Sequence, residues 1–190
     1  MRIISGKFKN KKLSFPKNFK TRPLKDSVRE NIFNILNHSN KLNIKIKNSI
    51  ILDVYAGTGS FGLECISRDA LRVFFVERDL DALKNLKKNI TSLNCEDKTF
   101  LFSSDVLEFF KNLDLKLYKK KFNLVFLDPP YNDQKLLDVV KIIKKKEILD
   151  KKHILIIHRE INSEKDIDKY INIIENRTYG RSQIFFGRVF

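Results

Sequence analysis

Residues 49–62 read SIILDVYAGTGSFG, and this stretch indicates the fold of the whole chain. Its first six residues are nearly all apolar, as in a β-strand that is buried on both faces of a parallel sheet. The glycines Gly57, Gly59 and Gly62 follow with the spacing G-x-G-x-x-G, and a helical pattern begins near Phe61. Glycines allow a tight turn and let a ligand lie against bare backbone. The stretch therefore predicts a strand, a ligand-binding turn and a helix.

Short apolar strands and amphipathic helices alternate along most of the chain. Further buried strands are expected at residues 73–76, 99–102, 122–127 and 154–157. Between these strands, apolar residues recur at helical spacing. This alternation is typical of a doubly wound, mainly parallel α/β sheet.

The last two strands break the alternation. Residues 170–174 and 184–189 flank a turn at 179–180 and have no helix between them, which predicts an antiparallel hairpin. With this hairpin the expected sheet has seven strands. The sequence contains no linker or internal repeat. We therefore predict a single domain over residues 1–190, with residues 1–25 as an N-terminal extension.

The N-terminal extension has a weak strand pattern of its own. Residues 1–15 alternate between polar and apolar side chains and predict a small basic β-hairpin. A loop follows, and then a helix. Asp26 or Ser27 is expected to cap this helix, which should end near residues 37–40.

Positive charge is concentrated in the extension. Residues 1–25 contain nine Lys or Arg and no Asp or Glu, so they carry +9 of the chain's net charge of +15. A uniform codon bias toward lysine would not concentrate charge in this way. The extension therefore indicates a phosphate-binding surface, with a merely solvated basic arm as the alternative. The nucleic-acid-binding residues are predicted to be Arg2, Lys7, Lys9, Lys11, Lys12 and Arg22.

Carboxylates near the glycine turn indicate which ligand binds there. Glu77 ends the second predicted strand, 20 residues after Gly57, where a carboxylate can accept both hydroxyl hydrogens of a ribose. A nicotinamide dinucleotide would use the same geometry, with its pyrophosphate at the helix N-terminus. Asp53 favours S-adenosylmethionine instead, because a carboxylate suits its ammonium group and would repel a pyrophosphate. Asp105 could cap a helix or accept from the adenine amino group, and Val106 could pack on the adenine face.

The cofactor site predicted from these features is drawn from the turn and from two later strand ends. It consists of Asp53, Tyr55, Ala56, Gly57, Thr58, Gly59, Glu77, Arg78, Asp105 and Val106.

The fourth predicted strand ends in Leu127-Asp128-Pro129-Pro130-Tyr131. The first and fourth strands flank the switch point of such a sheet, so Asp128 should lie beside the glycine turn. The exocyclic nitrogen of a base is a poor nucleophile, because its lone pair is delocalised into the ring. The Asp128 carboxylate and the Pro129 carbonyl could accept its two hydrogens and direct the lone pair at a sulfonium methyl group. Pro129 and Pro130 stiffen this arrangement, and Tyr131 offers a face for base stacking.

Asp128, Pro129, Pro130 and Tyr131 are therefore predicted to be the catalytic residues of an amino methyltransferase. No metal site is expected, because Cys65 and Cys95 lack metal-ligand or redox spacing. His38, His153 and His158 are scattered and receive no role. No apolar run approaches membrane-spanning length, and we expect a cytoplasmic monomer.

The chain resembles the RsmD-type methyltransferases of bacterial 16S ribosomal RNA over nearly its whole length. The most specific matching motifs are RIISGK at residues 2–7, TRP at 21–23 and DSVRENIF at 26–33. Residues 53–62, 75–79, 127–131 and 179–180 also match, although the cofactor turn and Asp-Pro-Pro-Tyr recur in many amino methyltransferases.

This resemblance implies a Rossmann-like class I methyltransferase fold. It also implies methylation of guanine N2 in 16S rRNA, with S-adenosylmethionine as donor and a partly assembled small ribosomal subunit as substrate. The basic hairpin and the Arg22 loop then become the RNA-contacting elements. Alternatively, Arg22 and Arg29 order the wall of the active site.

Other functions fit parts of the sequence. A DNA adenine-N6 or cytosine-N4 methyltransferase can share Asp-Pro-Pro-Tyr, but it usually needs a recognition domain for which 190 residues leave little room. A protein-glutamine methyltransferase would not need the basic extension. A non-catalytic RNA-binding assembly factor is the alternative from another class, and the intact Asp128 and Glu77 argue against it.

Overall fold

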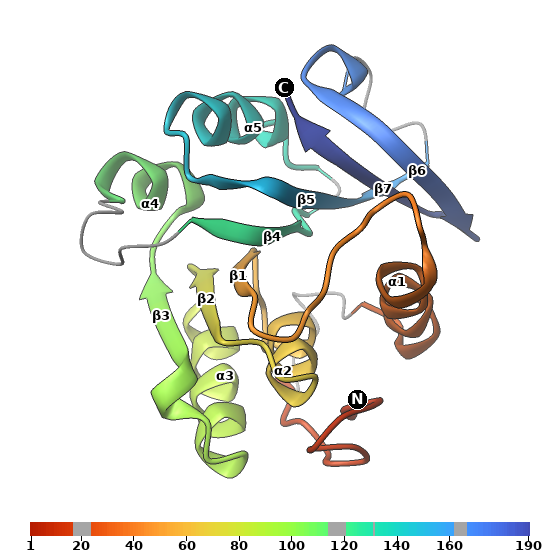
Figure 1. Cartoon of the computed structure of the whole chain (residues 1–190). Helices are drawn as coiled ribbons and strands as arrows, with labels where there is room; N and C mark the ends of the chain where they lie inside the picture. Colours follow the sequence, from red (N-terminus) through yellow and green to blue (C-terminus); the bar gives the residue numbers. More distant parts are fainter. Residues whose placement is uncertain (17–23, 114–120, 131, 162–166) are drawn as a thin grey trace.

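The described strands form one seven-stranded sheet with the order β3-β2-β1-β4-β5-β7-β6 (Figure 1). The computed structural model describes residues 1–16, 24–113, 121–130, 132–161 and 167–190. The strands are β1 Ile50–Val54, β2 Arg72–Glu77, β3 Thr99–Ser103, β4 Phe122–Leu127, β5 Leu149–Glu160, β6 Ile171–Tyr179 and β7 Ser182–Val189.

The sheet has its topological switch point at β1. This strand pairs in parallel with β2 on one side and with β4 on the other, so the strand order reverses there. At the far edge, β7 runs antiparallel to β5 and to β6. The predicted doubly wound, mainly parallel sheet with a C-terminal antiparallel hairpin is confirmed. Strand β5 is longer than the predicted residues 154–157.

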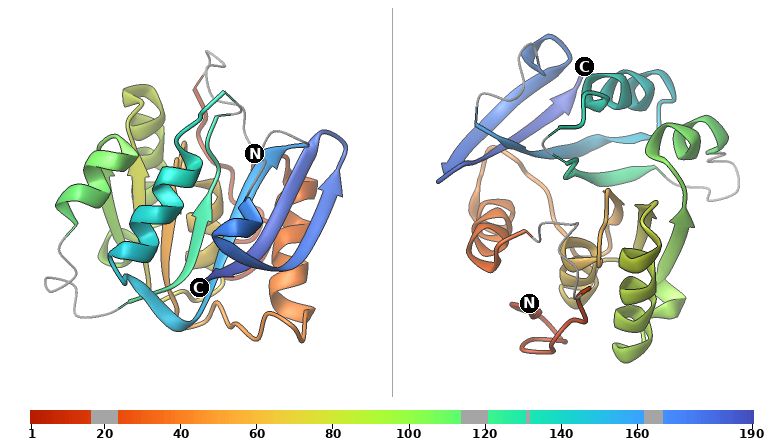
Figure 2. Two further views of the ribbon diagram at one scale, coloured as in Figure 1. Left: turned by 90° about the horizontal axis from the view of Figure 1, so that it is seen from above. Right: turned by 180° about the vertical axis from the view of Figure 1, so that it is seen from behind.

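Helices cover both faces of the sheet. On one face lie α1 (Asp26–His38), α2 (Ser60–Ser67) and α3 (Leu80–Ser92), and on the other lie α4 (Val106–Asn112) and α5 (Leu136–Lys145) (Figures 1 and 2). The short 3-10 helices η1 and η3 span Glu96–Lys98 and Ile167–Lys169.

Apolar strand residues supply a separate core to each helical layer. On the first face, the Phe61 ring of α2 stacks on Phe126 of β4, with ring centroids 4.1 Å apart. On the second face, Phe74 meets Phe122 edge to face at 5.2 Å. Burial on both faces explains why the central strands are continuous apolar runs.

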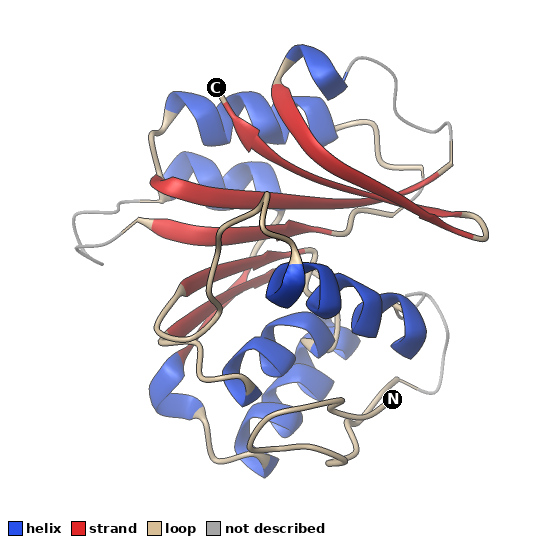
Figure 3. Cartoon of the chain, turned by 45° about the vertical axis from the view of Figure 1, so that its right-hand side comes forward, coloured by secondary structure: helices blue, strands red, loops and turns tan. Residues whose placement is uncertain are grey.

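The first 16 residues form an anchored loop with a short antiparallel pairing (Figure 3). Arg2 and Lys12 make a single bridge, and the Asn10 N–H donates to the Ile3 carbonyl at 2.9 Å. The predicted chain reversal is therefore present, but with less pairing than two strands would give. Ile3 and Leu13 are buried in the core on the α1–α3 face, so the loop is held by packing as well.

The predicted cap of the first helix is wrong. The helix begins at Asp26, so the N-cap position belongs to Lys25, which makes no side-chain cap bond. Asp26 instead lies in the first helical turn, where its carboxylate is 3.0 Å from the Arg29 guanidinium. An acid one turn before an arginine favours this pairing over capping. The helix ends at His38, inside the predicted range.

Candidate active site

A cleft of about 410 Å³ opens where β1, β2 and β4 end. The switch point of an open α/β sheet is the usual place for a ligand. Most of the predicted cofactor and catalytic residues line this cleft, namely Tyr55, Ala56, Gly57, Thr58, Glu77, Arg78, Asp105, Val106, Asp128, Pro129 and Pro130. Tyr131 lies outside the described residues.

The turn after β1 presents its backbone to the cleft. Gly57 has φ of +56°, and an added Cβ there would meet no described atom within 4 Å. Gly59 has φ of +81°, but a Cβ there would overlap the Leu86 side chain of α3. Gly59 does not line the cleft. Thus Gly57 faces the cleft, whereas Gly59 lets the turn pack on the neighbouring helix.

The Glu77 carboxylate ties the turn to the end of β2. One of its oxygens accepts from the Gly57 N–H at 2.7 Å. The other accepts from the N–H groups of Arg78 and Asp79, both at 2.8 Å. A carboxylate offers about four lone-pair positions, so these bonds leave room for a further donor from the cleft.

Asp53 does not line the cleft, although it was predicted to meet the cofactor. The residue is buried, and its carboxylate accepts from the Gly62 N–H of α2 at 2.9 Å. Burial raises the pKa of Asp53 well above its usual range, and the nearby charges of Asp128 and Glu77 add to this. Direct contact between Asp53 and an ammonium group does not fit this placement.

Asp105 both caps a helix and faces two cations. One oxygen accepts from the Leu107 N–H at 2.9 Å, as predicted for a cap of α4. The other oxygen lies 3.4 Å from the Arg78 guanidinium and 3.6 Å from the Lys135 ammonium. Burial alone would raise the pKa of Asp105, but the Leu107 N–H and the two cations together lower it. Asp105 therefore remains an ionised acceptor at the cleft wall.

Asp128 follows β4 beside a histidine that received no role from the sequence. The Nδ1 atom of His158 lies 2.7 Å from Oδ1 of Asp128. Leu127 and Ile157 are paired across β4 and β5, so the next residue of each strand meets at the cleft. His158 is buried and lines the cleft too. Its position directly after the predicted strand at 154–157 was the available signal in the sequence.

Arg159 binds the backbone at Pro130 and at Asp133. Its guanidinium donates to the Pro130 carbonyl at 3.0 Å and to the Asp133 carbonyl at 3.1 Å. The Asp133 N–H also donates to the Pro130 carbonyl, at 2.9 Å. Arg159 is buried and was not identified from the sequence. Its bonds hold the backbone on one side of the cleft.

The predicted nucleic-acid-binding residues in the described part of the extension are exposed. They are Arg2, Lys7, Lys9, Lys11 and Lys12. Arg22 lies outside the described residues. Met1 and Phe15 of the same extension line the cleft, so these basic side chains lie on an element that also forms a cleft wall.

The residues of the cleft fit S-adenosylmethionine better than a dinucleotide. The Gly62 N–H near the start of α2 is already occupied by Asp53, which leaves less room for a pyrophosphate there. Glu77 and Asp105 provide acceptors suited to a ribose and an adenine amino group, and Val106 adds an apolar surface. Within the described residues, no cluster of His, Cys, Asp or Glu could hold a metal ion. In the same part of the chain, no helix is long and apolar enough to span a membrane.

Comparisons with known proteins show which family this chain resembles. The family model described as Conserved hypothetical protein 95 matches residues 1–188. The chain is 31% identical to "Uncharacterized methylase RP545" of Rickettsia prowazekii (strain Madrid E), over 99% of this chain and 97% of the relative. It is 32% identical to "Ribosomal RNA small subunit methyltransferase D" of Buchnera aphidicola subsp. Acyrthosiphon pisum, over 83% of this chain and 77% of the relative.

A solved structure shares the fold along the whole chain. "Putative methyltransferase yhhF" from Escherichia coli superposes with a TM-score of 0.83, covering 100% of this chain and 97% of that one at 24% identity.

Proposed function

Because this chain belongs to the family described as Conserved hypothetical protein 95, the RsmD family, we propose that it methylates the exocyclic N2 of a guanine in 16S ribosomal RNA. S-adenosylmethionine is the methyl donor. The substrate is a partly assembled small ribosomal subunit, on which the enzyme acts as a single-domain monomer in the cytoplasm. Relatives that carry the name "Ribosomal RNA small subunit methyltransferase D" support this choice of RNA.

One observation carries the proposal. Asp128 and Pro129 line the same cleft as Gly57 and Glu77, so two hydrogen-bond acceptors for an amine lie beside the cofactor turn. An amine in this cleft is within reach of acceptors and methyl donor together, and such positioning lowers the barrier of a bimolecular transfer.

Several residues would hold the cofactor. The Gly57 backbone would face its amino-acid portion, Glu77 would accept from a ribose hydroxyl, and Asp105 and Val106 would meet its adenine. When bound, S-adenosylmethionine would supply a methyl group on a positively charged sulfur. As the nitrogen lone pair bonds to the methyl carbon, the carbon–sulfur bond breaks, S-adenosylhomocysteine leaves and the amine loses one hydrogen as a proton.

Asp128 and Pro129 make the amine reactive. Oδ1 of Asp128 is held by His158, so Oδ2 is directed to one amine hydrogen while the Pro129 carbonyl accepts the other. These two bonds draw the nitrogen out of conjugation and aim its lone pair at the methyl group. The carboxylate also stabilises the positive charge that develops on the nitrogen during attack.

The basic extension brings the RNA to this cleft. Arg2, Lys7, Lys9, Lys11 and Lys12 are exposed and suited to phosphate contacts, which orient an RNA without reading its sequence. Because Met1 and Phe15 of the extension line the cleft, RNA held on it lies near Asp128.

Mapping of methylated guanines in ribosomal RNA tests the function. In cells that lack this gene, one N2-methylguanine of 16S rRNA should disappear and should return when the gene is restored. Purified protein should methylate small-subunit particles isolated from the deletion strain, and double-stranded DNA is the control substrate. An unchanged set of methylated guanines, or transfer to DNA instead, would contradict the proposal.

A further inference from the structure

Asn89 of α3 joins two separate walls of the cleft. Its Oδ1 accepts from the Ser14 N–H at 2.6 Å, and its Nδ2 donates to the Ser14 carbonyl at 3.1 Å. The same Nδ2 donates to the Thr58 carbonyl at 3.0 Å. Asn89 is 1% exposed. One buried amide therefore links the N-terminal extension to the cofactor turn.

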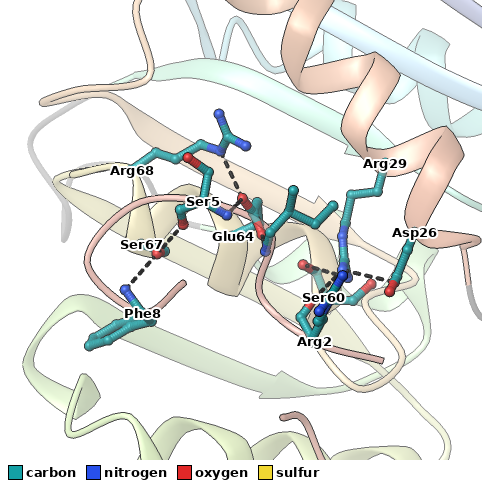
Figure 4. Close-up of polar contacts among 10 residues, drawn as sticks. Arg2, Ser5, Phe8, Asp26, Arg29, Ser60, Glu64, Ser67 and Arg68 are labelled. Carbon is teal, nitrogen blue, oxygen red and sulfur yellow. Dashed lines mark hydrogen bonds and ion pairs between the residues drawn. The ribbon is translucent and has the colours of Figure 1, made fainter. Parts of the chain in front are cut away.

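A second set of bonds anchors the other limb of the extension to α2 (Figure 4). The Glu64 carboxylate accepts from the N–H groups of Ile4 and Ser5, at 2.7 and 2.9 Å. The Ser67 hydroxyl accepts from the Phe8 N–H at 2.9 Å. A Cβ at Gly6 would overlap the Ser67 carbonyl, so the chain approaches the helix as closely as it can. These contacts pack the N-terminal extension against α2.

Both hydrogen-bond partners of Asn89 lie in or next to the wall of the cleft. Ser14 directly precedes Phe15, which lines the cleft, and Thr58 lines the cleft between the two glycines of the turn. Buried polar groups are costly when they lose their partners. If the extension moved away, both the Ser14 and Thr58 bonds to Asn89 would be disturbed. Asn89 therefore ties the position of the extension to the position of the turn.

We propose that Asn89 is a positioning residue that couples docking of the N-terminal extension to cofactor binding in the glycine turn. This inference rests on the proposed function. A cofactor that fixes the turn also fixes Thr58, and through Asn89 it stabilises the extension that carries the basic residues. Coupling between two binding events is reciprocal, so an ordered extension strengthens cofactor binding equally.

Two measurements on Asn89→Leu test this coupling. The first is the dissociation constant of S-adenosylhomocysteine by calorimetry, well below the melting temperature. The second is the rate of trypsin cleavage at Lys7, Lys9, Lys11 and Lys12, with and without S-adenosylhomocysteine. Removing these bonds should weaken ligand binding by about tenfold, from the usual strength of buried hydrogen bonds. The ligand should slow cleavage in the unaltered protein and no longer slow it in the variant.

Asn85→Leu is the matched control. Asn85 lies one turn earlier on α3, and its amide donates to the Asp81 carbonyl within the same helix. This variant should keep both the ligand affinity and the ligand's protection of the lysines. A loss in both variants would mean that general destabilisation of α3 is responsible, and the coupling would be refuted.

Ser14→Pro tests the same hydrogen bonds by a change in the extension. It removes the N–H that donates to Asn89, and the residue that it replaces is exposed. Cofactor affinity should fall although no residue of the turn is changed. If either Asn89→Leu or Ser14→Pro binds the ligand as tightly as the unaltered protein, Asn89 does not couple the two elements. If the unaltered protein binds no S-adenosylhomocysteine, the proposed function itself fails.

Discussion

The imidazole of His158 donates from Nδ1 to the Oδ1 atom of Asp128, over 2.7 Å. Asp128 directly follows β4, His158 lies near the end of the neighbouring parallel strand β5, and both line the cleft. A carboxylate on a strand end can rotate about its side-chain bonds. A bond to one of its oxygens fixes the direction of the other, which is what an acceptor for a substrate amine requires.

Replacing His158 should therefore slow the chemical step. In His158→Leu, kcat should fall by up to about 100-fold, the usual cost of a misplaced reacting group, while cofactor affinity stays within twofold. His158→Asn should recover much of the rate, because its amide N–H can occupy the position of Nδ1. Single-turnover transfer to small-subunit particles measures both variants.

His153→Asn is the control for this test. His153 lies on the same strand, but its Nδ1 contacts the Asp150 carbonyl and its Nε2 accepts from the Val189 N–H. Its replacement should leave kcat unchanged. Equal losses in the His153 and His158 variants would show that the effect comes from strand stability.

Gly57→Val should weaken cofactor binding through the backbone. The φ of +56° is strained for a β-branched residue, at a usual cost of about 1–3 kcal/mol, so the turn would leave its conformation, and the added side chain would enter the cleft that holds the ligand. Gly180→Val has the same strain, since its φ is +59°, but it lies in the turn between β6 and β7. Calorimetry with S-adenosylhomocysteine should show a loss for Gly57→Val alone. Unchanged binding would remove Gly57 from the cofactor site.

Neutralising the extension should weaken RNA binding in a salt-dependent way. With Lys7, Lys9, Lys11 and Lys12 changed to Gln, the log–log slope of affinity against salt should fall by about 0.7–0.9 for each phosphate that the protein no longer neutralises. The control changes the exposed residues Lys144, Lys145, Lys151 and Lys152, so it removes the same charge elsewhere. Titrations at several salt concentrations measure the slope. Equal slopes in the two variants would mean that the extension does not bind phosphate.

Asp53→Asn should stabilise the protein in a pH-dependent manner. Burial raises the pKa of Asp53 in the folded state, so folding favours its neutral form. The stability that this group contributes is complete below its unfolded pKa of about 4 and is lost as the pH rises toward the folded value. An amide can still accept from the Gly62 N–H and carries no charge. Thermal unfolding should show equal stability at the lowest pH and a growing advantage for the variant above it.

A constant difference in melting temperature across the pH range would contradict this account of Asp53. It would indicate that the carboxyl group has the same pKa in the folded and the unfolded protein, with its bond to Gly62 offsetting the effect of burial.

The sheet could be predicted because its central strands are buried on both faces, which makes them continuous apolar runs. The glycine turn between the first strand and the first helix after it was a second recognisable signal. The site at the ends of β1 and β4 followed from the topology of such sheets. Asp105 as a helix cap was predictable from its place before Val106, whereas Asp26 lies one residue inside its helix and pairs with Arg29. The roles assigned to Tyr131 and Arg22 remain predictions.

Contacts between distant segments could not be predicted in the same way. His158 meets Asp128 only because β5 pairs with β4 in one particular register. Asn89 occupies a helical position whose polar side chain gives no sign of binding a segment 75 residues earlier. Each of these residues is a single polar side chain in a normal strand or helix pattern. Its partner is determined by how the helices and strands pack against one another.

Methyl transfer by Asp128→Ala tests the central role of the carboxylate at the end of β4. The measurement is single-turnover transfer of labelled methyl from S-adenosylmethionine to small-subunit particles, with S-adenosylhomocysteine affinity determined on the same preparation. The rate should fall by about 100- to 1,000-fold, as expected for loss of a group that stabilises the transition state, while the affinity stays within twofold. An Asp128→Ala variant that transfers methyl groups at the unaltered rate would contradict the mechanism.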